Sequence, residues 1–242
     1  QKRSAFSFIG GSNNFTCYPS QLDAYARNHN YVGEAEGRSA SGAFSRAFPQ
    51  TPERVLDAPG IVDDFYLNVL DWGKKNSLAV GLGPSVYLWN GKTGAVSELM
   101  SIDNGHYITS IRWIHDGTSI AIGSSEGFVQ IWDVEKGRKT RTILAAPANQ
   151  RVGSLAWNKH LLSTGSRDGS IGTNDVRLPK PLILQHQSQH QQQVQEVCGL
   201  EWSPDGQQLS SGGNDNLIHV WDAGQASPRF IFSEHRSAVK AI

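Results

Sequence analysis

Few side chains in this chain have the type and spacing that catalysis or metal binding requires. Cys198 could act as a nucleophile beside a histidine, but it lies in the apolar stretch VCGLEW, where a small buried thiol is the usual outcome. His186 and His190 are four residues apart, which on a helix could supply half of a metal site, and no third ligand is near in sequence. The chain has no GxxxxGK[ST] phosphate loop and no CxxC pair. The sequence therefore predicts no catalytic residue, no metal and no cofactor.

Charge and cysteine content exclude further classes of protein. The chain has 22 basic and 22 acidic side chains, so a net charge of zero gives no general attraction to nucleic acid or to an anionic membrane surface. Its two cysteines are too few for a disulfide-built fold and fit a reducing compartment. Residues 1–10 lack the apolar run of a secretory signal, and no apolar stretch reaches 18 residues. We expect no nucleic-acid partner and no membrane partner.

Tryptophan spacing is the most informative pattern, because it indicates the repeating strands that position the other residues. The first series, in short apolar stretches, repeats at intervals of 41, 44 and 45 residues. Each member of a second series follows its partner by 17 or 19 residues, with Asn174 standing where one tryptophan is missing. The first series is Trp72, Trp113, Trp157 and Trp202, and the second is Trp89, Trp132, Asn174 and Trp221.

A period of 40 to 45 residues with W-D endings is typical of the blades of a WD-repeat β-propeller. VYLW, VQIW and IHVW carry the β-branched and aromatic residues that suit strands, and Ser203–Gly206 (SPDG) has the composition of a tight turn. We expect an all-β fold with the first-series tryptophans on the inner strands, each filling space between neighbouring blades.

In WD repeats, a turn acid six residues before the second tryptophan joins it in a network with a strand Ser or Thr and a loop His. Asp215 and Trp221 match this pattern, and Asp168, Trp132 and Trp89 are assigned to the same structural role. The positions where the His is expected hold other residues, namely Asn104, Ala148 and Gln193, while His235 is well placed for a fifth repeat.

The expected organisation has two parts. Residues 1–48, rich in Gly, Ser and Asn, read as a flexible N-terminal arm, and residues 49–242 as a partial propeller. Blades are expected at about 69–100, 101–144, 145–184 and 185–232, with the start of a fifth at 233–242. Four blades and a fraction predict a ring that is incomplete in this chain. The glutamine-rich run 185–195 is expected to be a solvated insertion before the fourth blade.

From about Phe48 onward, the chain closely resembles the Fizzy family of WD-repeat activators of the anaphase-promoting complex. The resemblance rests on specific sequence segments that WD proteins in general do not share. They are PERVLDAP, RVGSLAWN and QEVCGL, with GGNDN in the last complete repeat. DDFYLNVLDWG together with NDVR is most similar to the plant-type mitotic branch.

The resemblance implies a seven-bladed propeller that recruits substrates to a ubiquitin ligase and transfers no ubiquitin itself. Its implied partners are subunits of the anaphase-promoting complex, degron-bearing substrates such as cyclins, and mitotic checkpoint proteins, in the nucleus and cytoplasm. The family's N-terminal docking motif and C-terminal Ile-Arg tail are not found in residues 1–242. The alternative is a WD-repeat scaffold, or a degenerate paralogue, that binds partners without activating a ligase.

The resemblance also implies a binding site. In the family, the Asn residues of the GGNDN turn face the lysine-glutamate-asparagine degron, which assigns Asn214 and Asn216 here, and Arg167 is expected on the same rim. Asn side chains both donate and accept, so they can hold a polar degron. The plainer interpretation is that both Asn residues suit a tight turn, because Asn tolerates a left-handed backbone.

Overall fold

The computed structural model describes residues 51–52, 54–102, 105–187 and 195–242. Contacts divide the chain into two compact units, residues 1–58 and 59–242. The described residues form strands and turns without any helix, which confirms the all-β prediction. Accordingly, that part of the chain offers no helix of the length and apolar character needed to cross a membrane. The expected N-terminal arm, residues 1–48, lies outside the described residues.

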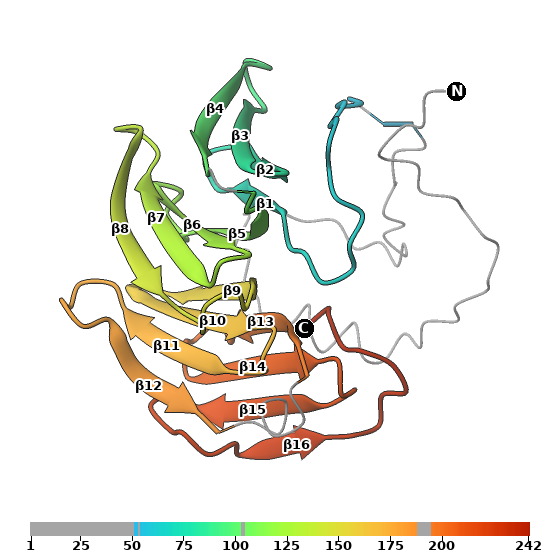
Figure 1. Cartoon of the computed structure of the whole chain (residues 1–242), viewed down its shortest axis with the longest axis vertical. Helices are drawn as coiled ribbons and strands as arrows, with labels where there is room; N and C mark the ends of the chain where they lie inside the picture. Colours follow the sequence, from blue (N-terminus) through green and yellow to red (C-terminus); the bar gives the residue numbers. More distant parts are fainter. Residues whose placement is uncertain (1–50, 53, 103–104, 188–194) are drawn as a thin grey trace, which may run out of the picture. The chain divides into compact units, whose positions relative to one another are not determined.

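The described strands between Leu70 and Phe232 form four sheets of four strands (Figure 1). In each sheet the strands pair antiparallel in chain order, as expected for propeller blades. In sheet order, the strands are β1 (Leu70–Gly73), β2 (Ser77–Leu82), β3 (Ser85–Asn90) and β4 (Val96–Ser101); β5 (Ile108–Trp113), β6 (Ser119–Ser124), β7 (Phe128–Asp133) and β8 (Arg138–Leu144); β9 (Val152–Asn158), β10 (Leu161–Ser166), β11 (Ile171–Asp175) and β12 (Leu182–His186); β13 (Val197–Trp202), β14 (Gln208–Gly213), β15 (Ile218–Asp222) and β16 (Phe230–Phe232).

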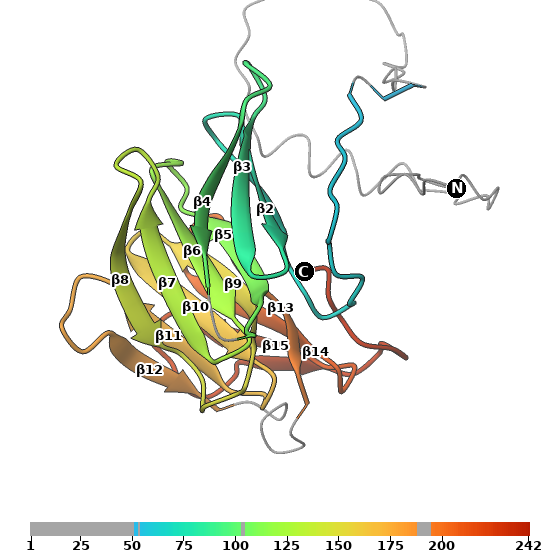
Figure 2. The same cartoon turned by 45° about the horizontal axis from the view of Figure 1, so that its top comes forward.

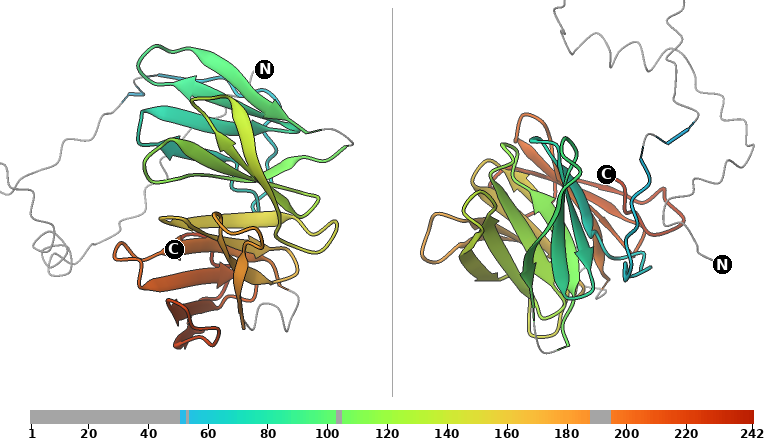
Figure 3. Two further views of the ribbon diagram at one scale, coloured as in Figure 1. Left: turned by 90° about the vertical axis from the view of Figure 1, so that its left-hand side faces the viewer. Right: turned by 90° about the horizontal axis from the view of Figure 1, so that it is seen from above.

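The two tryptophan series occupy matching positions in the sheets. Trp202 pairs with Leu209 on β14, which pairs with Trp221 on β15, so one strand separates the two tryptophans. The same alignment joins Trp72 to Trp89, Trp113 to Trp132 and Trp157 to Asn174. The first series lies on β1, β5, β9 and β13, the strands through which neighbouring sheets contact one another (Figures 2 and 3). The placement of these tryptophans on inner strands is therefore confirmed.

The first-series tryptophans link successive blades, with one exception. The indole N–H of Trp113 donates to the carbonyl of Asp71 at 3.1 Å, and that of Trp157 donates to the carbonyl of Arg112 at 3.1 Å. Trp72 differs from the expectation: it is 57% exposed and packs edge-on against Trp89 of its own blade, with ring centroids 5.7 Å apart. The prediction that every first-series tryptophan fills an inter-blade space is wrong for Trp72, because no described blade covers that side of the first sheet.

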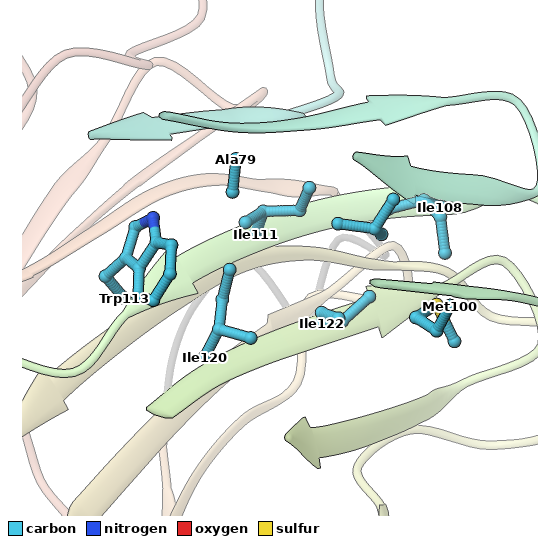
Figure 4. Close-up of a cluster of buried hydrophobic side chains, with 8 residues drawn as sticks. Ala79, Met100, Ile108, Ile111, Trp113, Ile120 and Ile122 are labelled. Carbon is cyan, nitrogen blue, oxygen red and sulfur yellow. The ribbon is translucent and has the colours of Figure 1, made fainter. Parts of the chain in front are cut away.

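The apolar core lies between the sheets and not within one of them. Figure 4 shows the cluster between the first two blades, where Ala79 and Met100 of the first meet Ile108, Ile120 and Ile122 of the second. All are at most 6% exposed. Burial of one Ile or Met side chain contributes about 1.5–3 kcal/mol to stability. Because each blade's apolar face is covered by its neighbour, stacking of blades stabilises the fold.

One assignment near the third blade needs correction. Gln185 and His186 belong to β12, where they pair with Gly172 and Ile171, whereas the sequence placed them in the solvated insertion. His186 is 1% exposed. The strand extends into the glutamine-rich run because the backbone of β11 continues to offer hydrogen bonds beyond Leu184. Residues 188–194, including His190, lie outside the described residues.

Candidate functional site

A row of equivalent turn residues defines one edge of the blades. In three consecutive blades, the residue after the second strand donates its backbone N–H to the carbonyl of the residue before the first strand. Ser125 bonds to Tyr107 at 3.0 Å, Arg167 to Arg151 at 2.9 Å and Asn214 to Glu196 at 2.9 Å. Because the bond repeats, Ser125, Arg167 and Asn214 lie at the same end of their blades, as the sequence predicts for Arg167 and Asn214. We call Ser125, Arg151, Arg167, Glu196 and Asn214 the rim.

The two Asn residues of the GGNDN turn differ in side-chain hydrogen bonding and in backbone conformation. Asn214 is exposed, its Oδ1 accepts from the hydroxyl of Tyr66 at 2.8 Å, and its Nδ2 donates to Oε1 of Gln195 at 2.8 Å. Asn216 has a φ of 67°, the left-handed region that Asn tolerates better than most residues. The turn interpretation thus accounts for Asn216. Asn214 is not among the residues with a positive φ, so backbone conformation does not explain why an Asn occupies this exposed position.

Residues 64–69, which we call the strap, cross from the first blade to the third and fourth. The side chain of Asn68 donates from Nδ2 to the carbonyls of Gly153 at 2.7 Å and Cys198 at 3.2 Å. Its backbone pairs with the second blade through Thr109 and Ile111. One residue therefore makes hydrogen bonds to three different blades, and the strap fixes how they sit around the rim.

Arg151 is the electrostatic centre of the rim. Its Nε and Nη2 bond to the two carboxylate oxygens of Glu196 at 2.7 and 2.8 Å, and its Nη1 bonds to Asp64 at 2.7 Å. These carboxylates, Glu196 foremost, raise the pKa of Arg151 above its ordinary value despite partial burial. Burial opposes ionisation of Asp64, but the N–H of Tyr66 and the guanidinium of Arg151 offset it and lower its pKa. Both shifts favour the charged forms of Arg151 and Asp64.

Lys240 ties the strap to the last described residues. Its ammonium donates to the carbonyls of Phe65 and Leu67, the latter at 2.8 Å, and lies 5.2 Å from the centre of the Phe65 ring. Partial burial lowers the pKa of Lys240, and the nearby acidic groups partly restore it. The rim and strap together therefore present both signs of charge beside neutral amides, a surface suited to an extended polar peptide.

Nucleophilic chemistry at this site would depend on Cys198, and its environment opposes it. The thiol is fully buried, and burial raises the pKa of Cys198 to about 12. The thiolate that a nucleophile requires is therefore almost unpopulated at neutral pH.

Comparison with known proteins assigns the family. The model of the CDC20/Fizzy WD40 domain matches residues 56–242. The chain belongs to the CDC20/Fizzy WD40 domain family. It is 50% identical over 204 residues to "Cell division cycle 20.1, cofactor of APC complex" of Arabidopsis thaliana, covering 81% of this chain and 44% of that protein. It is also 50% identical over 199 residues to "WD repeat-containing protein slp1" of Schizosaccharomyces pombe, covering 81% and 39%.

A solved structure agrees with the family assignment. A chain of "Crystal Structure of Mitotic Checkpoint Complex" matches with a TM-score of 0.76 and 46% identity, covering 86% of this chain and 62% of that one. The Fizzy-family propeller predicted from the sequence is confirmed. The present chain spans less than half the length of the two curated relatives above.

The family's blade network is present in altered form. Asp215 accepts the N–H of Leu217 at 3.1 Å, and Asp168 accepts from Ser166 and from both the N–H and the hydroxyl of Ser170. Both acids thus stabilise turns, at the ends of β14 and β10. The indole N–H of Trp132 donates to Gln130 on its own strand at 3.0 Å, and Trp89 is 9% exposed in the first blade.

Trp221 lies between two histidines that the sequence did not connect with it. His186 packs edge-on against it with ring centroids 5.1 Å apart, and His219 stacks on it at 5.5 Å. Nε2 of His186 is 2.9 Å from Thr173 Oγ1, which is 2.9 Å from Ser163 Oγ, the acceptor for the Trp202 indole at 3.1 Å. A histidine thus does enter a buried polar chain in this Fizzy-family propeller, seven residues before Gln193. The glutamine-rich insertion hid it by lengthening the distance to Trp202.

Proposed function

We propose that this chain is the propeller portion of a co-activator of the anaphase-promoting complex, and that its rim binds lysine-glutamate-asparagine degrons. The observation that carries the proposal is the exposed amide of Asn214. One of its N–H groups and one lone pair of Oδ1 are used within the protein, at 2.8 Å each. An amide has two of each, so a donor and an acceptor are left for a ligand.

The charges around Asn214 support a degron of this composition. Arg167 is exposed at the same end of the neighbouring blade and can pair with the degron glutamate. Asp64 keeps part of its carboxylate exposed and can attract the degron lysine. Asn216, at the other side of the turn, offers a second amide. None of these contacts requires the protein to make or break a covalent bond, so we propose a recruiting role and no enzymatic one.

Relatives support the choice of ligase. The relative from Arabidopsis thaliana is named a cofactor of the APC complex, and one from Dictyostelium discoideum is named a subunit of the anaphase-promoting complex. We propose the corresponding partners for this protein: subunits of that ligase, degron-bearing substrates such as cyclins, and mitotic checkpoint proteins. We further propose that it acts in the nucleus and cytoplasm.

Titration of the purified chain with a fluorescent peptide tests the rim. The peptide contains Lys-Glu-Asn, and a second peptide carries Ala-Ala-Ala in its place. Asn214→Ala, Arg167→Ala and Asn216→Gly should each weaken binding of the first peptide by about 5- to 150-fold, because a buried polar group loses its partner. Glycine is used at position 216 because alanine would be strained at a φ of 67°.

Arg138→Ala is the matched control, since Arg138 is an exposed arginine on β8 outside the rim. Wild-type affinity in Asn214→Ala, Arg167→Ala and Asn216→Gly alike would refute the degron site. Specific binding by the protein without any stimulation of substrate ubiquitination in a reconstituted ligase assay would support the scaffold alternative.

A further inference from the structure

We propose that Tyr66 is a positioning residue of the rim, whose hydroxyl sets the orientation of the Asn214 amide and thereby the affinity for a polar peptide. This inference rests on the proposed function. Tyr66 is 148 residues from Asn214 in the chain, and its hydroxyl donates to Asn214 Oδ1 at 2.8 Å. No sequence motif connects the two residues.

The two bonds of Asn214 give its amide a direction. The Tyr66 hydroxyl occupies the oxygen side, and Oε1 of Gln195 accepts from the nitrogen side at 2.8 Å. With both ends held, rotation by 180° about the bond that carries the amide would place a nitrogen where Tyr66 donates and an oxygen opposite the Gln195 oxygen. The remaining N–H and the remaining lone pair therefore point in defined directions toward solvent.

Tyr66 is itself held on three sides, which a positioning residue requires. The guanidinium of Arg151 lies 5.2 Å from the centre of its ring. Its backbone N–H donates to Oδ1 of Asp64 at 2.9 Å, and Phe65 packs edge-on against it with ring centroids 5.3 Å apart. Because Arg151 also binds Asp64 and Glu196, the aromatic ring and the backbone under Asn214 belong to one connected cluster. The hydroxyl thus reaches Asn214 from a fixed base.

Loss of this hydroxyl would affect binding through Asn214 alone. In Tyr66→Phe the ring remains under Arg151 and the strap keeps its backbone bonds, but the amide oxygen loses its donor. The amide is then oriented only by its bond to Gln195, so a larger fraction turns over and a ligand that needs one orientation selects from a mixture. A hydrogen bond of this kind is worth roughly a 3- to 10-fold change in affinity.

A double-mutant cycle in the purified chain tests the inference. The affinity for the Lys-Glu-Asn peptide is measured for wild type, Tyr66→Phe, Asn214→Ala and the double variant, together with thermal melting of each. Tyr66→Phe should weaken binding roughly 3- to 10-fold with an unchanged melting temperature, and should add nothing once Asn214 is alanine. Tyr87→Phe is the matched control, because Tyr87 also donates its hydroxyl to a side chain, that of Glu98, on the outer part of the first blade.

The outcomes separate this inference from the function on which it rests. If Asn214→Ala weakens binding while Tyr66→Phe binds as wild type does, the positioning role is overturned and the degron site stands. An undiminished effect of Tyr66→Phe in the Asn214→Ala background also overturns it, because a general structural effect would be additive. Wild-type affinity in Asn214→Ala alone refutes the role of Asn214 in the proposed function.

Discussion

Arg151 and Glu196 form a two-point ion pair at the junction of the third and fourth blades, with Nε 2.7 Å from Oε1 and Nη2 2.8 Å from Oε2. Their side chains are 12% and 7% exposed, so both charges are largely withdrawn from water. Such a pair stabilises little by itself, but removing one partner leaves the other buried and uncompensated. The pair therefore holds the rim in one arrangement.

Replacing Arg151 by methionine should destabilise the chain by about 3–5 kcal/mol, because the Glu196 carboxylate would stay buried without its cation. Urea unfolding followed by far-UV circular dichroism measures the change. Adding Glu196→Gln in the same background should recover part of the loss, since the neutral amide is easier to bury. An Arg151→Met variant as stable as wild type would show that the pair has no structural role.

Asn68 should tolerate an acid poorly, because its Nδ2 faces the carbonyls of Gly153 and Cys198. In Asn68→Asp a carboxylate would oppose two carbonyl oxygens, at a cost of about 1–3 kcal/mol or more at pH 7. The folded state raises the pKa of that new carboxyl, so the loss should shrink as pH falls and the group becomes a donor. Melting curves at several pH values test this, with the exposed Asn149→Asp as the control. Equal effects of the two substitutions would contradict a structural role for the bonds from the Asn68 side chain to the third and fourth blades.

His186 should make stability depend on pH in mild acid. Burial lowers its pKa to about 4 from an ordinary value of 6.5, although the carbonyl of Gln225 acts in the opposite direction. Between these values the unfolded chain binds the proton more tightly, so stability is complete above pH 6.5 and declines as pH falls toward 4. The loss at pH 4 should be on the order of 3 kcal/mol.

Denaturant titrations between pH 4 and 7 measure this dependence. A His186→Gln variant, which cannot titrate at that position, should show a clearly smaller slope in the same window, while the exposed turn variant His115→Gln should behave as wild type does. A wild-type stability that stays level from pH 7 to 4 would be incompatible with a neutral, buried His186.

The second-series tryptophans should differ in their contribution to stability. Trp221 is fully buried between two histidine rings, whereas Trp132 is partly exposed. Trp221→Ala should cost about 3–5 kcal/mol by leaving a large cavity, and Trp132→Ala about 1–3 kcal/mol. Chemical denaturation of the two variants compares them directly, and equal losses would mean that neighbouring side chains collapse into the Trp221 site.

The repeat spacing was enough to determine the blades. A strand pairs with its chain neighbour through a short turn, so the distance between Trp202 and Trp221 fixes their alignment across β14. The same locality placed Arg167 and Asn214 at one end of their blades, because each follows the second strand of its sheet. The same reasoning failed for Trp72, which no described blade covers, and for His186, which the insertion before the fourth blade displaced from its expected spacing.

The contacts within the proposed site were decided by the tertiary structure. Tyr66 and Asn68 lie in the segment DDFYLNVLDWG, and Arg151 begins RVGSLAWN, but these segments do not indicate the partners of their side chains. The partners Asn214, Gly153 and Glu196 are between 45 and 148 residues away. Each such contact depends on where the strap crosses the third and fourth blades. That path is set by the packing of whole sheets against one another. Local periodicity in a single sequence predicts strands and turns, but it does not predict this packing. Sequence by itself therefore placed Arg167 and Asn214 at one end of their blades, and packing between blades brought Tyr66, Arg151 and Glu196 together beside Asn214.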